Sequence, residues 1–322
     1  MTLGKRIAMV CITFAIGVPT LHAAGDEQRP LRLIVPFQPG GQGDIVARAV
    51  ADKMSQNGQA MIVDNRPGAG GQIAMKLVLE AEPDGRTLVM GSVATMATRP
   101  NALAKPAYDP IKDFSAVSLI ASSPYVVVVN KSSTIKAISD LIAAAKAAPG
   151  KLTYGSSGAG SGMHLTTELF GMMTGLKFVH VAYKGSAPAT VDLLGDQISF
   201  LFDNLPPAMP HIKSGQLRAL AVTTKTRLST LPGVPTVQEA GVSGFESGSW
   251  SGIVVRRGTN RGAVDALYRK LHEALASSSD FKKRLEMLGN TTVVSTPDDF
   301  TAFIKAENEK WADVIRAIGL TL

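Results

Sequence analysis

Residues 31–44, LRLIVPFQPGGQGD, join a short apolar run to a glycine-rich turn and to the start of a segment with helical periodicity. The apolar run predicts a buried strand over 31–37, and apolar residues at helical spacing predict a helix over about 43–54. The same order of strand and helix returns over 60–81. Repeated strand–helix units of this length predict right-handed crossovers and a mainly parallel sheet.

A second series of strands and helices begins near residue 124 and is followed by a helical tail. The tail has no sheet of its own, so we expect it to pack on the first unit, with the chain crossing near 122–124 and 248–251. The sequence therefore predicts an α/β protein of two lobes, each a mainly parallel sheet flanked by helices. The predicted boundaries are 24–123 plus 250–322 for lobe 1 and 124–249 for lobe 2. The strands of the second series are predicted over 125–130, 151–156, 179–183, 198–203, 218–223 and 250–255, and the tail helices over 261–276, 280–288 and 300–318.

The first 23 residues have the pattern of a secretory signal peptide. Lys5 and Arg6 precede an apolar stretch over 7–18, Pro19 interrupts it, and small residues end at Ala23. The apolar stretch is shorter than the ~20 residues that span a bilayer, so a cleaved signal is favoured over a permanent anchor. We therefore expect export to the periplasm and removal of residues 1–23. The single cysteine lies in that segment, so the mature chain has neither a disulfide nor a cysteine-based metal site.

The composition of the 322 residues excludes several function classes. Hydrophobic residues make up 45% and charged residues 18%, which is typical of a globular protein. The net charge is +7, but Lys and Arg form no basic run and only 6% of residues are aromatic, so no nucleic-acid partner is expected. The histidines outside the signal segment have no metal-ligand spacing, and we expect neither a metal nor a cofactor.

The glycine-rich turn after the first strand is the first candidate binding loop. Glycines let a backbone approach a ligand, and the following helix offers free N–H groups and the positive end of its dipole, which together favour an anion. Two alternatives remain open: a tight turn without a ligand, and a dinucleotide fingerprint built from Gly41, Gly43 and Asp64. Val46 stands where the third glycine of that fingerprint belongs. The candidate residues of this loop are Phe37, Gln38, Pro39, Gly40, Gly41 and Asp44.

A second candidate loop, YGSSGAGSGMH over 154–164, joins a strand to a helix in the other predicted lobe. Its neutral hydroxyl donors suit a carboxylate that must bind and leave, and the candidate residues are Ser156, Ser157, Ser161 and His164. A serine hydrolase with His164 as base is an alternative, although no serine here has the Gly-x-Ser-x-Gly context of a nucleophile elbow. Tyr183 and Asp203 each end a predicted strand, where α/β sheets place ligand groups; Asp203 either orients a ligand or caps the next helix.

Seven short stretches follow one another between residues 31 and 260. They are PFQPGGQGD (36–44), VDNRPGAGG (63–71), PDGRTL (83–88), YDPIKDF (108–114), YGS (154–156), HVAYKG (180–185) and LPGVPT (231–236). In this order they resemble the extracytoplasmic substrate-binding proteins of tripartite tricarboxylate transporters, the Bug or TctC-type family.

This resemblance implies a two-lobed periplasmic-binding fold of type II with a small carboxylate between the lobes. The loops 37–44 and 156–164 would hold the ligand from opposite sides through backbone N–H groups, serines and bridging waters, and Asp203 would help to order the pocket. The resemblance also implies a monomer that works with membrane permease subunits. Some residues depart from the family pattern and are expected to reshape the pocket: Gln38, Gln42, Arg99 before Pro100, and Met163.

We therefore expect an exported receptor, not an enzyme, that captures a small organic mono- or dicarboxylate by closing its lobes and presents it to a transporter. Such a receptor gains thermal stability when its ligand is added. One alternative is a periplasmic serine hydrolase that uses Ser156, Ser157 or Ser161 with His164. The other is a nicotinamide-dependent dehydrogenase that uses the glycines of the first loop with Asp64.

Overall fold

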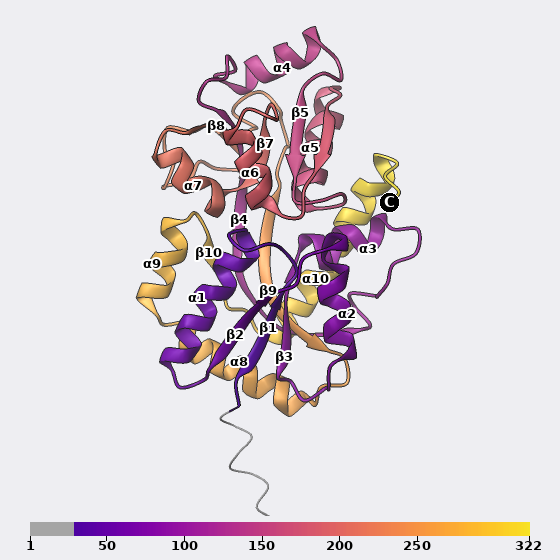
Figure 1. Ribbon diagram of the computed structural model, residues 1–322, viewed down its shortest axis with the longest axis vertical. Coiled ribbons are helices and arrows are strands. Elements are labelled where there is room, and N and C mark those ends of the chain that lie inside the picture. Colours follow the sequence, from indigo (N-terminus) through magenta and orange to yellow (C-terminus); the bar gives the residue numbers. More distant parts are fainter. Residues whose placement is uncertain (1–28) are drawn as a thin grey trace, which may run out of the picture.

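The computed structural model describes residues 29–322 and shows two α/β lobes joined by long strands (Figure 1). The predicted signal segment 1–23 lies outside the described residues. In lobe 1 the strands lie side by side in the order β10-β4-β9-β3-β1-β2. Their bounds are β1 (Leu31–Val35), β2 (Met61–Asn65), β3 (Thr87–Ser92), β4 (Phe114–Asn130), β9 (Gly248–Arg256) and β10 (Thr291–Thr292). No helix within 29–322 is long and apolar enough to cross a membrane.

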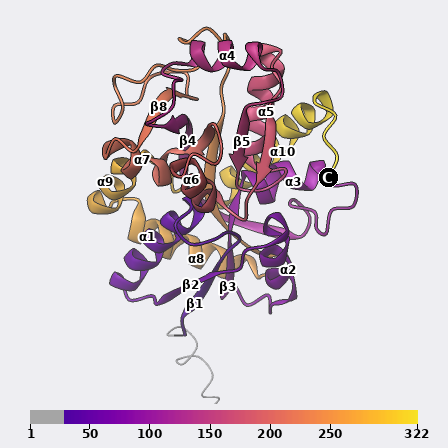
Figure 2. The same cartoon turned by 45° about the horizontal axis from the view of Figure 1, so that its top comes forward.

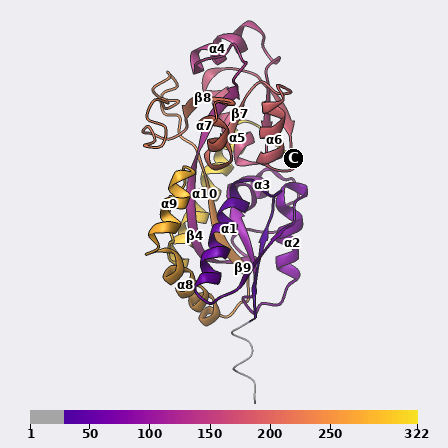
Figure 3. The same ribbon diagram turned by 60° about the vertical axis from the view of Figure 1, so that its left-hand side comes forward.

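Helices cover both faces of the lobe 1 sheet. They are α1 (Gln42–Gln56), α2 (Gln72–Glu80), α8 (Arg261–Leu275), α9 (Ser279–Met287) and α10 (Pro297–Ala317), with the short turns η1 (Ala69–Gly71), η2 (Ala94–Thr98) and α3 (Arg99–Ala102). Successive residues of a strand face opposite sides. Leu33 and Val35 of β1 therefore belong to a core with α1, α8 and α9, whereas Ile34 belongs to a core with α2 and α10. Figure 3 shows α8 and α9 on one side of the sheet and α2 on the other.

Lobe 2 is built on the second half of β4. This strand pairs with β9 as far as Pro124 and then with two strands of lobe 2 from Tyr125 onward. The elements of lobe 2 are β5 (Thr153–Ser156), β6 (Val179–Ala182), β7 (Leu201–Asn204), β8 (Leu217–Val222), α4 (Ile138–Ala147), α5 (Gly162–Thr174), α6 (Ser186–Leu194) and α7 (Leu205–Lys213). Buried aromatic rings, among them Phe170, Phe200 and Phe202, fill one of its cores. Figure 2 shows α4 at the end of this lobe that lies far from lobe 1.

The predicted two-lobed α/β fold is confirmed, but the sheets are mixed rather than mainly parallel. β1 runs parallel to β2 and β3, whereas β9 runs antiparallel to both β3 and β4. The chain leaves lobe 1 along β4 and returns along β9, so these two strands pass the boundary in opposite directions and pair antiparallel. We propose that the lobes hinge where β4 changes partner, between Pro124 and Tyr125.

Candidate functional site

A cavity of about 40 Å³ lies between the two lobes. Lobe 1 lines it with the loop 36–43, the end of β3 and the start of β9, and lobe 2 lines it with Tyr125 and the first residues of its helices. None of the lining residues, all of them within 29–322, carries a charged side chain. The lining residues that carry a hydroxyl are Ser92, Tyr125, Ser157, Ser186, Ser249 and Ser251.

Four helices begin at this cavity. α1 starts at Gln42, α5 at Gly162 and α6 at Ser186, and Asn204 immediately precedes α7. The first N–H groups of a helix have no partner inside it, and the helix dipole places a partial positive charge there. The cavity thus combines hydroxyl donors with helix N-termini, a setting that stabilises an anion without a cationic side chain.

Glycine is needed where the two lobes come closest. A Cβ atom on Gly41 would lie 3.1 Å from Ser186 Oγ in the other lobe. A Cβ atom on Gly162 would lie 3.3 Å from Val93 Cγ1 of lobe 1 and would also collide with the hydroxyl of Tyr125 in its own lobe. Gly40 has a φ of +83°, which residues with a side chain rarely adopt. The glycines of the two loops therefore permit the close approach that encloses the cavity.

Asp44 holds the lobe 1 loop in place and does not line the cavity. Its carboxylate accepts hydrogen bonds from Gly40 N–H at 2.9 Å, from Arg48 Nε at 3.0 Å and from Asn65 Nδ2 at 3.0 Å. Burial alone would raise the pKa of Asp44, but these hydrogen bonds and the charge of Arg48 hold it below its ordinary value. The ionised carboxylate therefore fixes the turn that opens α1.

Two neutral histidines hold the lobe 2 loop. Ser156 Oγ lies 2.6 Å from His180 Nε2, and the ring of His180 stacks on that of His164 with centroids 4.0 Å apart. His164 Nδ1 accepts a hydrogen bond from Gly160 N–H at 3.0 Å. Burial lowers the pKa of His164 to about 3 and that of His180 to about 4, so both rings are neutral near pH 7. The alternative that pairs a loop serine with His164 as base is not favoured, because the neighbouring strand β6 brings His180 to Ser156 instead.

Asp203 lies behind the cavity, fully buried at the end of β7. One carboxylate oxygen accepts a hydrogen bond from Thr190 Oγ1 at 2.7 Å, and the other has no partner among the described residues. Burial raises the pKa of Asp203 to about 7, against the opposing hydrogen bonds from Thr190 and from Asn204 N–H. Asp203 thus fits a role in ordering lobe 2 better than direct contact with a ligand.

Three lining side chains have a buried polar atom without a hydrogen-bond partner in residues 29–322. These atoms are Gln42 Oε1, Asn204 Oδ1 and Ser251 Oγ. A buried polar group that stays unpaired costs about 1–3 kcal/mol. All three atoms are therefore available to a polar ligand or to water in the cavity.

Arg99 joins the two lobes instead of lining the cavity. Its guanidinium donates a hydrogen bond to Ala159 O, and the neighbouring Thr98 donates one to Gly160 O. Both donors belong to lobe 1 and both acceptors to the lobe 2 loop. These two residues therefore stabilise the closed arrangement of the lobes.

Only some of the other predicted site residues reach the cavity. Phe37, Gly41 and Ser157 line it. Gln38 and Tyr183 line a separate, more open depression, and Pro39 is exposed at the tip of the first loop.

The remaining predicted residues of the second loop have structural positions. Ser161 caps α5 by accepting a hydrogen bond from His164 N–H at 3.3 Å. Met163, one residue before His164, is 1% exposed in a core of lobe 2. At the start of α5 only Gly162 lines the cavity, because neighbouring helical residues point in different directions.

Several lining residues were not found by the sequence analysis, above all the serines of the strands. Ser249 and Ser251 flank Trp250 in β9, and this period of two places both hydroxyls on one face of the strand. This alternation in the sequence could have identified both serines as residues of one strand face. Ser92 and Ser186 carried no comparable pattern, since their place at the cavity depends on how the lobes meet.

The fold and the cavity define a solute-binding receptor of the periplasmic-binding class. The model of the tripartite tricarboxylate transporter family receptor matches residues 46–320. The chain belongs to this family, as its seven stretches predict, and its function is that of a solute-binding receptor.

Known proteins resemble the chain over most or all of its length. BugT of Bordetella pertussis is 37% identical over 326 residues, which cover 100% of each chain. The structure of an R. palustris protein with adipate is 37% identical and has a TM-score of 0.87, covering 91% of this chain and 98% of that one. The structure of MatC from Rhodopseudomonas palustris with bound malate is 30% identical and has a TM-score of 0.84, covering 89% of this chain and 98% of that one.

Proposed function

We propose that the protein is an exported receptor that holds a small organic mono- or dicarboxylate between its lobes and presents it to the permease subunits of a tripartite transporter. The observation that carries this proposal is a cavity lined by hydroxyls and four helix N-termini and by no charged side chain. Relatives solved with adipate and with malate support the choice of a carboxylate. Residues 1–23 provide the export signal, and the receptor acts as a monomer.

The ligand binds by closure of the lobes. Backbone N–H groups at the start of α1 and the serines of both lobes donate to the carboxylate, so only a closed form satisfies all of its oxygens. A cavity of about 40 Å³ has room for a few water molecules rather than for a six-carbon diacid. The lobes therefore part at the hinge to admit the ligand and close again around it.

The residues do not support hydrolase chemistry. Ser156 contacts His180 but is fully buried, and its oxygen also bonds the backbone of Gly158. A nucleophile must reach its substrate, so this pair shapes the loop. The protein binds its ligand without altering it.

The residues do not support dinucleotide binding either. Gly41 and Gly43 line the cavity, but Asp64 does not. Its carboxylate is held by Arg32 Nε at 2.9 Å and by Arg66 Nε at 2.8 Å. The acid of the fingerprint is therefore engaged in ion pairs away from its glycines.

Calorimetry and thermal melting with adipate, malate and the neutral adipamide test this function. We expect both acids to bind and adipamide to fail; a ligand at 100 times its Kd raises the unfolding free energy by about 2.7 kcal/mol. Ser157→Ala removes one neutral donor and weakens binding about fivefold to tenfold. Ser214→Ala is the matched control, because Ser214 is exposed on lobe 2 and bonds only its own turn. Failure of every mono- and dicarboxylate to bind, or turnover of any of them, would contradict the proposal.

A further inference from the structure

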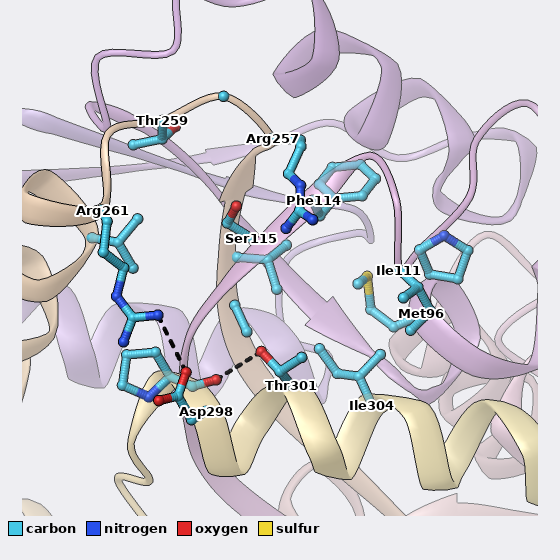
Figure 4. A pocket seen from close by; sticks show the side chains of 16 residues that line it. Met96, Ile111, Phe114, Ser115, Arg257, Thr259, Arg261, Asp298, Thr301 and Ile304 are labelled. Atoms are coloured by element: carbon cyan, nitrogen blue, oxygen red, sulfur yellow. Dashed lines mark hydrogen bonds and ion pairs between the residues drawn. The ribbon is translucent and has the colours of Figure 1, made fainter.

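A second and larger cavity, of about 340 Å³, lies within lobe 1 (Figure 4). It is bounded by the start of β4, the end of β9 and the first turns of α8 and α10, and it shares no lining residue with the cavity between the lobes. Its volume falls in the range of about 300–1,000 Å³ that small-molecule sites occupy.

The inner wall of this cavity is apolar. Phe114, Val254 and Ile304 are each at most 3% exposed, and Met96 and Val264 complete the wall. The cavity is open to solvent on the opposite side, where Arg257, Arg261 and Asp298 are exposed. An apolar wall below a charged rim is the arrangement that an amphipathic ligand fits.

The rim of the cavity carries one surplus positive charge. Arg261 and Asp298, both at the rim, form an ion pair at 3.2 Å, and Arg261 also bonds Asp265. In contrast, the guanidinium of Arg257 has no hydrogen-bond or ion-pair partner among residues 29–322. Arg257 is exposed and comes from the segment that follows β9; it lines the cavity together with Phe114 (Figure 4).

We propose that this cavity is a second binding site, for an amphipathic monocarboxylate whose apolar chain or ring packs on Phe114 and Met96 and whose carboxylate binds Arg257. A free guanidinium above an apolar wall matches such a ligand in both charge and shape. The cavity between the lobes differs from it, since it has no charged side chain and suits a compact polar ligand. The second site does not depend on the function proposed for the first.

Octanoate is the probe, with octan-1-ol as its uncharged counterpart, and binding is measured by calorimetry on the full mature chain. We expect Arg257→Gln to weaken octanoate binding about tenfold, as for loss of a charge-assisted hydrogen bond, and to leave octan-1-ol binding unchanged. Arg269→Gln is the matched control, because it removes the same charge from an exposed position of α8 that does not line the cavity. Ser115→Leu, at a lining position, fills the space and abolishes binding of both probes.

Adipate binding is measured on every variant, and we expect it to remain at the wild-type value. Loss of octanoate binding at the cavity within lobe 1 is then distinguished from loss of adipate binding at the cavity between the lobes. Octanoate that binds Arg257→Gln or Ser115→Leu as tightly as the wild type would overturn the proposal. Absence of octanoate binding to the wild type at millimolar concentration would overturn it as well.

Discussion

The two loops that meet at the cavity between the lobes are stabilised in opposite ways. The lobe 1 loop is held by an ionised carboxylate, Asp44, whereas the lobe 2 loop is held by two neutral imidazoles, His164 and His180. In both lobes the titratable groups lie behind the loop, and only neutral side chains and backbone line the cavity. Charge therefore shapes the loops, and only neutral groups are left to contact a ligand.

Lowering the pH has the largest expected effect on the unfolding free energy, because it acts on the two neutral histidines that hold the lobe 2 loop. The folded pKa values of His164 and His180, about 3 and about 4, lie below the ordinary value of about 6.5. The unfolded chain therefore binds protons that the folded chain does not, and the unfolding free energy falls as pH drops from about 6.5 towards 4. The loss reaches about 1.4 kcal/mol per pH unit for each histidine.

Urea unfolding across this pH range measures the effect. His164→Asn keeps an acceptor for Gly160 N–H and makes the slope of the unfolding free energy against pH shallower. Asp203→Asn makes it steeper, because the raised pKa of Asp203, about 7, gives stability at low pH that is lost as pH rises through 7. Equal slopes in the wild type and His164→Asn would show that the histidines are not held neutral.

Gly162→Ala tests the close approach that only a glycine allows. The new methyl group meets the Tyr125 hydroxyl at the start of α5, and relief of such a clash costs about 1–3 kcal/mol. We expect adipate affinity to fall about tenfold to hundredfold in calorimetry. Gly233→Ala is the control, since a Cβ atom there meets nothing within 4 Å and φ is not in the left-handed region. Equal affinities in the two variants would contradict the role of Gly162.

Asp44→Asn breaks the charged support of the first loop. We expect a loss of about 1–3 kcal/mol in unfolding free energy at pH 7, because the bond from Arg48 is no longer charge-assisted. Adipate binding weakens with it, since one amide oxygen replaces the two oxygens that accept from Gly40, Arg48 and Asn65 and fix the turn. Asp52→Asn is the control: Asp52 is exposed on the same helix and pairs only with Arg284. A loss no greater than that of the control would refute the role of Asp44.

Arg99→Ala has the smallest expected effect. It removes one hydrogen bond between the lobes, worth about 0.5–1.5 kcal/mol, and shifts the empty protein towards an open form. Adipate affinity falls about threefold, and the radius of gyration from X-ray scattering rises. Arg316→Ala, which loses only an exposed pair with Asp313, changes neither quantity. An unchanged radius in Arg99→Ala would mean that this contact does not hold the lobes together.

Most elements could be predicted from local patterns. The helix expected over 261–276 is observed as Arg261–Leu275, and the strand expected over 250–255 as Gly248–Arg256. The first half of β4 was missed, because FSAVSLIASSP over 114–124 mixes serines with a proline and shows no strong strand pattern. These residues form a strand because β9 and β10 pair with them from distant parts of the chain.

The candidate site was predicted in outline and missed in detail for the same reason. Glycine and serine patterns identified the loops that hold Gly41 and Ser157, since backbone freedom is a local property. Ser92 and Ser186 were missed, because their place at the cavity follows from the return of β9 and from the closure of the lobes.

A crystal structure of the protein with adipate would show whether neutral groups alone capture the anion. We expect a carboxylate in the cavity between the lobes that accepts hydrogen bonds from N–H groups at 41–43 and from at least one hydroxyl of lobe 2. We also expect that no lysine, arginine or charged histidine touches this carboxylate. An adipate ion-paired with a cationic side chain, or bound outside this cavity, would contradict the claim that neutral groups capture the anion.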